Sequence, residues 1–140
     1  MGQAGRGLSQ QRRAKATKGL DTAARRLTLA ELLLKGGFPE EFLRPIREAL
    51  GWGLTSMLAF FDELEPGADL PSSRRIQSEL VEKDYLPEEL AMRLARVREL
   101  TEPCGEQQAA PLSTQTAEAM VAAVQSLIDV GQRKSVEWAL

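Results

Sequence analysis

The chain has 140 residues, of which 43% are hydrophobic and 27% are charged. This length suffices for one domain with one hydrophobic core and is too short for two substantial domains. The composition is typical of a soluble globular protein and excludes wholesale disorder. No apolar run reaches the roughly 18 to 20 residues that a membrane span needs, and the N-terminus lacks the apolar stretch of a signal peptide. We therefore expect a cytoplasmic protein without membrane contact.

Positive charge is concentrated at the N-terminus. Residues 1–28 carry seven Arg and Lys side chains and one Asp, whereas the rest of the chain carries 11 basic and 19 acidic residues. This division predicts a basic, flexible arm or linker over residues 1–19 and a helical domain over residues 20–138. Such an arm can bind phosphate backbones through counterion release, and a solvated linker is the alternative. The candidate nucleic-acid-binding residues are Arg12, Arg13, Lys15, Lys18, Arg25 and Arg26.

The first predicted helix covers residues 20–35, where apolar residues recur at three- and four-residue spacing. Gly36 and Gly37 end this helix, because glycine readily adopts the left-handed conformation common at a helix C-terminus. The helix could begin as early as Ser9, whose hydroxyl group could cap it.

The second predicted helix begins at Pro39, which suits a first helical position, and its two following glutamates favour the positive end of the helix dipole. Pro45 lies inside this segment and cannot donate a backbone hydrogen bond, so the helix either starts again there or bends. Pro66 and Gly67 stop it.

Two glycines flank a tryptophan inside the second helix. Gly51 and Gly53 each cost about 1 kcal/mol relative to alanine in a helix. Close approach of another backbone, with Trp52 filling the space beside it, would offset this cost, and a ligand pocket is the alternative. Gly51, Trp52 and Gly53 are the candidate interaction surface, and burial of Trp52 in the core is the competing interpretation.

Three further helices are predicted from their start signals. Ser72 or Ser73 can cap the third, Pro87 and two glutamates open the fourth, and Ser113 can cap a long last helix. No segment alternates apolar and polar residues over the length of a strand. Long helices joined by short turns favour antiparallel neighbours, so the predicted fold is all-α: an up-and-down four-helix bundle with an additional short helix.

The residues needed for common catalytic and metal sites are missing from this sequence. It contains no histidine, which removes the usual general base and the Glu-x-x-His ligands of a di-iron bundle. Cys104 is the only cysteine, which excludes an internal disulfide and a cysteine-rich zinc site. The glutamates that cluster near arginines are typical of a solvated helix surface. We therefore predict no catalytic residue, no metal and no cofactor.

Two stretches resemble the HEPN superfamily of helical bundles. AARRLTLAELLLKGGFPEEFLRPIREALGWGLTSMLA looks like the two opening helices of that family, and STQTAEAMVAAVQSLIDVG, which follows a polar loop, looks like its last helix. The likeness covers roughly residues 20–138. Ribonucleases of the family carry an arginine followed four to six residues later by a histidine. Arg93, Arg96 and Arg98 lie in that neighbourhood, and no histidine follows them.

The resemblance therefore implies the non-catalytic branch of the family, because the general acid or base for RNA cleavage is missing. Such a domain dimerises or docks, often beside a nucleotidyltransferase or as part of a larger helicase-like protein. The leading hypothesis is a non-enzymatic interaction module that binds a protein partner or forms a homodimer. The alternatives are non-specific nucleic-acid binding by the basic arm and an enzyme that uses the three arginines with carboxylates.

Overall fold

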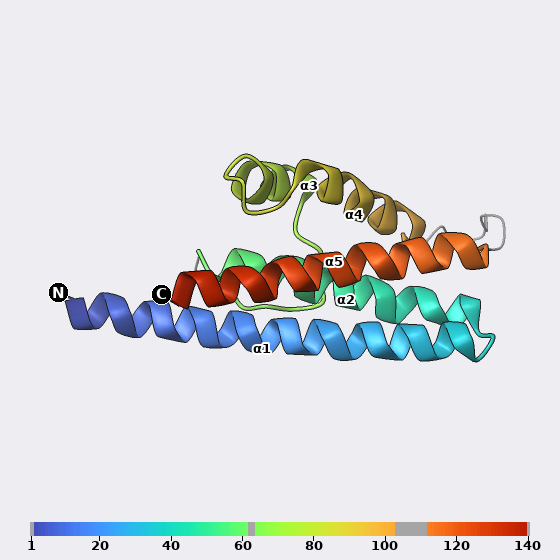
Figure 1. Cartoon of the computed structure of the whole chain (residues 1–140), viewed down its shortest axis with the longest axis horizontal. Helices are drawn as coiled ribbons and strands as arrows, with labels where there is room; N and C mark the ends of the chain where they lie inside the picture. The colour runs from blue at the N-terminus through green and yellow to red at the C-terminus, as the bar shows by residue number, and fades with distance from the viewer. Residues whose placement is uncertain (1, 62–63, 103–111, 140) are drawn as a thin grey trace.

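The computed structural model of the chain describes residues 2–61, 64–102 and 112–139, with side chains described over 10–61, 64–102 and 112–136. Every regular element within these ranges is a helix, which confirms the predicted all-α class (Figure 1). The elements are α1 Gly2–Lys35, α2 Pro39–Ala59, α3 Ser73–Ile76, the π-helix η1 Gln77–Val81, α4 Glu88–Leu100 and α5 Thr114–Ala139.

The first helix begins at Gly2, before Ser9, the earliest start that we expected, so Ser9 lies inside the helix and not at its cap. Residues 2–19 belong to α1 and are continuous with the predicted helix, where we had predicted a flexible arm. Ala16 is fully buried, and a Cβ atom added to Gly19 would lie 2.0 Å from the Oγ of Ser56 in α2. The small residues Ala16 and Gly19 therefore extend the apolar face of α1 toward the N-terminus. Lys18 between them and the basic residues before Ala16 concealed this continuation in the sequence.

The turn between α1 and α2 follows the local signals. Gly37 has a positive φ of 84°, and Pro39 is the first residue of α2. The amide of Phe38 donates to the carbonyl of Leu33 at 2.9 Å, which satisfies one of the last carbonyls of α1. α2 then continues through Pro45 without starting again, and it ends at Ala59, before the predicted stop at Pro66.

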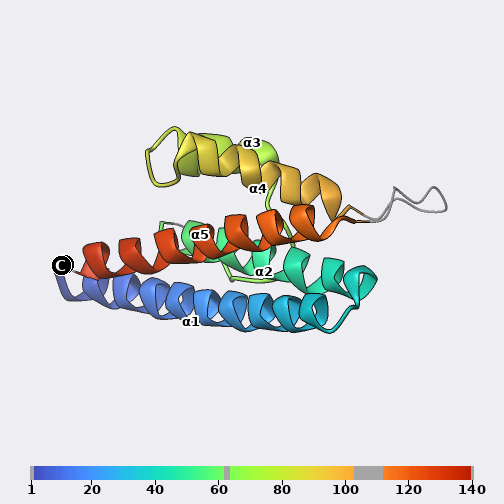
Figure 2. The ribbon, with the colours of Figure 1, turned by 45° about the vertical axis from the view of Figure 1, so that its right-hand side comes forward.

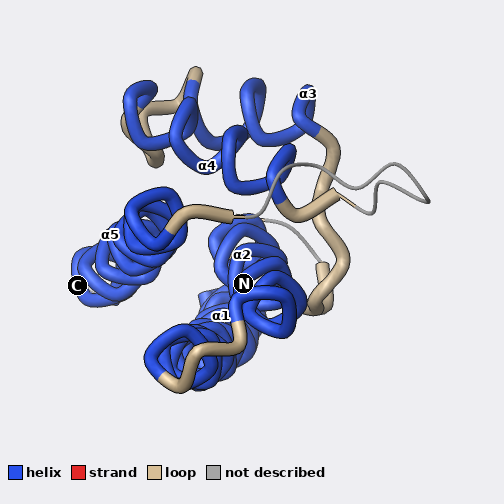
Figure 3. The backbone as a smooth tube through the Cα atoms, turned by 90° about the vertical axis from the view of Figure 1, so that its right-hand side faces the viewer, coloured by secondary structure: helices blue, strands red, loops and turns tan. Residues whose placement is uncertain are grey.

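α2 is the most deeply buried helix. Residues 53–59 are all buried, so this half of α2 is covered on every side, as expected for a helix in the centre of a core. α2 contacts α1, α5, α4 and η1. Seen end-on, α1, α2 and α5 form a triangle, and α4 with α3 makes a layer on the side away from α1 (Figure 3). The hydrophobic core therefore runs along α2.

Direction alternates among the four long helices (Figures 1 and 2). α1 and α2 run antiparallel to each other, and so do α4 and α5 (Figures 1 and 2). The caps of two later helices form: Ser72, one of the two candidates for α3, accepts at Oγ from the amide of Arg75, and Ser113 Oγ accepts from the amide of Thr116, both at 3.1 Å. The π-helix η1 after α3 was not predicted. Asp84, in the turn from η1 to α4, has a positive φ of 61°.

Gly19→Ala tests whether the first half of α1 packs as a helix. In a free arm the change would be neutral or slightly stabilising, whereas here the new methyl group meets Ser56 Oγ. We expect a loss of about 1–3 kcal/mol in the free energy of unfolding, measured by urea denaturation. Ser56→Ala removes a buried hydroxyl that lacks a hydrogen-bond partner among the described residues, so the double variant should regain part of that loss. Additive effects of the two changes would contradict this packing.

Candidate interaction faces

Gly51 and Gly53 lie inside the packing of the chain, not on an exposed surface. A Cβ atom on Gly51 would lie 2.0 Å from the carbonyl oxygen of Ala68, and one on Gly53 would lie 2.7 Å from a methyl group of Leu127. Trp52 is half-buried and packs against the core. The predicted interaction surface is therefore not available at the two glycines. Gly51 matches the other interpretation, close approach of another backbone, whereas Gly53 makes room for the side chain of Leu127.

Thr55 fixes the segment that approaches Gly51. Its hydroxyl donates to the carbonyl of Gly51 at 2.7 Å and accepts from the amide of Gly67 at 3.0 Å. Thr55 is buried, so these bonds form away from solvent. The chain between α2 and α3 is thereby held against the helix that it has just left.

The six basic candidate residues lie on α1. Lys18, Arg25 and Arg26 are exposed, Lys15 forms an ion pair with Glu65, and Arg12 and Arg13 are half-buried. Lys18 and Arg25 are seven residues apart, which places them on one helix face about 10 Å from each other. The structure thus brings these charges together on a helix and not on a free arm.

An exposed apolar group lies at the C-terminal end of α1. Leu29 is 40% exposed, Leu32 is 62% exposed, and Phe38 in the following turn is 52% exposed. Leu29 and Leu32 lie outside the buried stripe that includes Leu27 and Ala30. Sequence reasoning missed this group, although leucines off the predicted apolar face were a usable signal.

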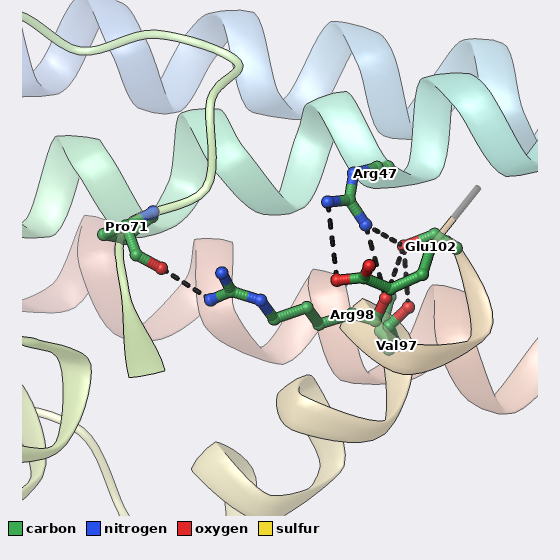
Figure 4. Close-up of polar contacts among 6 residues, drawn as sticks. Arg47, Pro71, Val97, Arg98 and Glu102 are labelled. Atoms are coloured by element: carbon green, nitrogen blue, oxygen red, sulfur yellow. Dashed lines mark hydrogen bonds and ion pairs between the residues drawn. The ribbon is translucent and has the colours of Figure 1, made fainter. Parts of the chain in front are cut away.

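The arginines of α4 make hydrogen bonds within the protein. Arg93 pairs with Glu89 at 2.9 Å, and Arg96 pairs with Glu99 at 3.3 Å. Arg98 donates to the carbonyl oxygen of Pro71 at 2.5 Å, which ties α4 to the segment before α3 (Figure 4). These contacts are typical of helix surfaces and loop anchoring.

Arg47 connects α2 to the C-terminal end of α4. Its guanidinium donates to the carbonyl of Arg98 at 3.3 Å and to the hydroxyl of Thr101 at 3.2 Å, and it lies 3.8 Å from a carboxylate oxygen of Glu102 (Figure 4). The last carbonyls of a helix lack partners within the helix, so a cation there is favourable. This cluster therefore caps α4.

A cavity of about 190 Å³ opens between α2, α3, η1 and α4. Most of its lining is apolar, and Met92 on its α4 side is 70% exposed. Its charged lining residues are Glu88 and Arg98. No prediction from the sequence pointed to this cavity, because its walls come from three separate segments between Leu50 and Arg98.

Across the described ranges, no group of three or more Cys, Asp or Glu residues could hold a metal ion. Cys104 lies outside these ranges. None of the described helices combines the length and apolar character that crossing a membrane would require.

Comparison of the chain with protein-family models, with curated proteins and with solved structures found no match. The site residues are therefore assigned from geometry alone.

Gly51→Ala tests the close contact between α2 and the segment that follows it. Alanine favours a helix by about 1 kcal/mol over glycine, but here its Cβ meets backbone atoms of Ala68, so we expect a net loss of about 1–2 kcal/mol in the free energy of unfolding. Gly67→Ala is the matched control, because the space around Gly67 is open and its φ is not positive. That change should be neutral or stabilising in the same urea titration. A stabilising Gly51→Ala would refute the contact.

Proposed function

We propose that the protein is a non-enzymatic helical module that associates with a protein partner, in the first place with a second copy of itself. The observation that carries this proposal is that some apolar side chains are exposed at the end of α1 and on α4. These are Leu29, Leu32 and Phe38 at the end of α1, and Met92 beside the α4 cavity. Regular helix faces with apolar side chains are suited to pairing with another helix.

The finer description of the fold is part of this proposal. We take α1, α2, α4 and α5 as the four helices of an up-and-down bundle, with α3 and η1 as the additional short element. The resemblance of residues 20–138 to non-catalytic HEPN bundles supports an accessory role in a nucleic-acid-related or nucleotidyltransferase-associated system. The ion pairs of Arg93 and Arg96 support a non-catalytic function, since both guanidinium groups are engaged by neighbouring glutamates.

Self-association is measured by sedimentation velocity and light scattering of the whole chain. We expect a reversible dimer at protein concentrations up to about 100 µM, where a complex of micromolar Kd is almost fully formed. A chain that stays monomeric over this range would contradict the homodimer.

Incubation with labelled RNA should leave the RNA intact, and cleavage that copurifies with the protein would contradict the non-enzymatic assignment.

A second candidate function is non-specific nucleic-acid binding by the basic face of α1. Exposure of Lys18, Arg25 and Arg26 on one helix favours it, because fixed cations can neutralise phosphates and release counterions. No exposed aromatic side chain lies between them for stacking on bases, so the expected binding is independent of sequence.

The triple variant Lys18→Glu, Arg25→Glu, Arg26→Glu tests this candidate. Fluorescence anisotropy with a labelled single-stranded oligonucleotide should show binding by the native chain that weakens steeply with added salt and is lost in the variant. Lys83→Glu is the control, since Lys83 is exposed and lies outside α1. Binding that ignores salt, or that survives the triple change, would count against the basic face.

A further inference from the structure

The cavity beside α4 is large enough to accept an apolar side chain from outside. Its volume is about 190 Å³, and cavities of roughly 150 Å³ lined by apolar residues can hold a benzene molecule. Leu50, Leu54 and Ile76 contribute to its walls. Met92 lines the same cavity but is 70% exposed, so one face of α4 presents both an opening and an unburied side chain. Methionine is flexible and fills irregular apolar spaces well.

The two charged residues of this cavity lie near opposite ends of α4. Glu88 and Arg98 are ten residues apart, which corresponds to about 15 Å along the helix. Among the described residues neither forms an ion pair: the side-chain hydrogen bond of Arg98 goes to the neutral carbonyl of Pro71. A partner that matches this face therefore needs a cation opposite Glu88, an anion opposite Arg98 and an apolar side chain between them.

α4 itself meets these requirements when it is turned end to end. The backbone of Arg93 lies midway between Glu88 and Arg98, and it also lies midway between Ala91 and Ala95. A two-fold axis that lies between the two helices at the level of Arg93, on the face of α4 opposite the Arg93 side chain, sets Glu88 opposite Arg98 of the second copy, twice in each dimer. It also sets the small residues Ala91 and Ala95 opposite each other, which allows the two helices to approach closely. An interface with two-fold symmetry must be self-complementary in this way.

We propose that two copies of the chain form an antiparallel dimer through the cavity face of α4, with Met92 of each copy inserted into the cavity of the other. This inference rests on the proposed function and identifies the surface and the partner. Two ion pairs between Glu88 and Arg98 fix the register of the helices. Charge pairs arranged in this way give specificity by penalising wrong alignments.

The apolar group on α1 does not offer the same fit to a second copy. An antiparallel pairing that sets Leu29 opposite Leu32 also sets Arg26 opposite Lys35 of the second copy, so like charges meet at both ends of the contact. Because like charges across an interface are unfavourable, α1 is the poorer surface for self-association. The face on α4 is therefore the one that selects a second copy.

Charge reversal at the two positions tests the register. Glu88→Arg alone sets two arginines against each other, and Arg98→Glu alone sets two glutamates against each other. Each variant should lower the association constant at least about tenfold in sedimentation velocity. A mixture of the two variants restores opposite charges at both contacts, so a heterodimer of nearly native affinity should form. Circular dichroism of each variant establishes that it is folded, since Arg98 also contacts Pro71.

Two further variants separate the possible outcomes. Met92→Glu should also abolish the dimer, and it provides a test that does not depend on Arg98. Leu32→Glu changes the apolar group on α1 and should leave the dimer intact. A dimer that persists in Glu88→Arg and Met92→Glu would overturn the α4 interface while leaving the proposed function in place, and disruption by Leu32→Glu alone would move the interface to α1. A native chain that is monomeric would overturn the homodimer itself.

Discussion

Burial of the second half of α2 on every side is the constraint on which the rest of the structure depends. Residues 53–59 are buried without exception, so α1, α5 and the α3–α4 layer must all contact one helix. This crowding requires small residues where the neighbours come closest. Gly19 faces Ser56, Gly51 faces the backbone of Ala68, and Gly53 faces Leu127. The helix-propensity cost of these glycines is offset by the contacts that a larger residue would prevent.

Because much of α2 is buried in the core, the polar side chains near it hold the neighbouring segments in place. Thr55 holds the segment after α2, and Arg47 joins α2 to the carbonyl of Arg98 near the end of α4. Arg98 anchors the segment before α3. An arginine near a helix end, such as Arg47 or Arg98, could suggest a catalytic site. Their hydrogen bonds go instead to backbone carbonyls and to a hydroxyl, which explains why arginines lie there in a chain without histidine.

Local signals in the sequence identified the ends of several helices, whereas contacts between residues far apart in the chain could not be predicted. Gly37 and Ser113 were predicted correctly, and Ser72 was one of two candidates, because a turn or a cap depends on neighbours within three residues. The sequence allowed α1 to begin as early as Ser9 and missed its start at Gly2. The contact of Gly19 with Ser56 was missed because the two residues lie far apart in the chain. The glycines of α2 suggested a close backbone, but nothing near them in the sequence identified Ala68 as that partner.

The arrangement of the layers links self-association with the basic charges of α1. α4 and α1 lie on opposite sides of α2 and α5 (Figure 3). A dimer joined through α4 therefore carries its two α1 helices on the outside, with Lys18 and Arg25 of both copies facing solvent. When one basic face of such a dimer is bound to a polyanion, the other basic face is held close to the same polyanion. Its effective concentration is therefore raised. Pairing through α4 would thus add a second basic face to such a contact without adding any residue to the site.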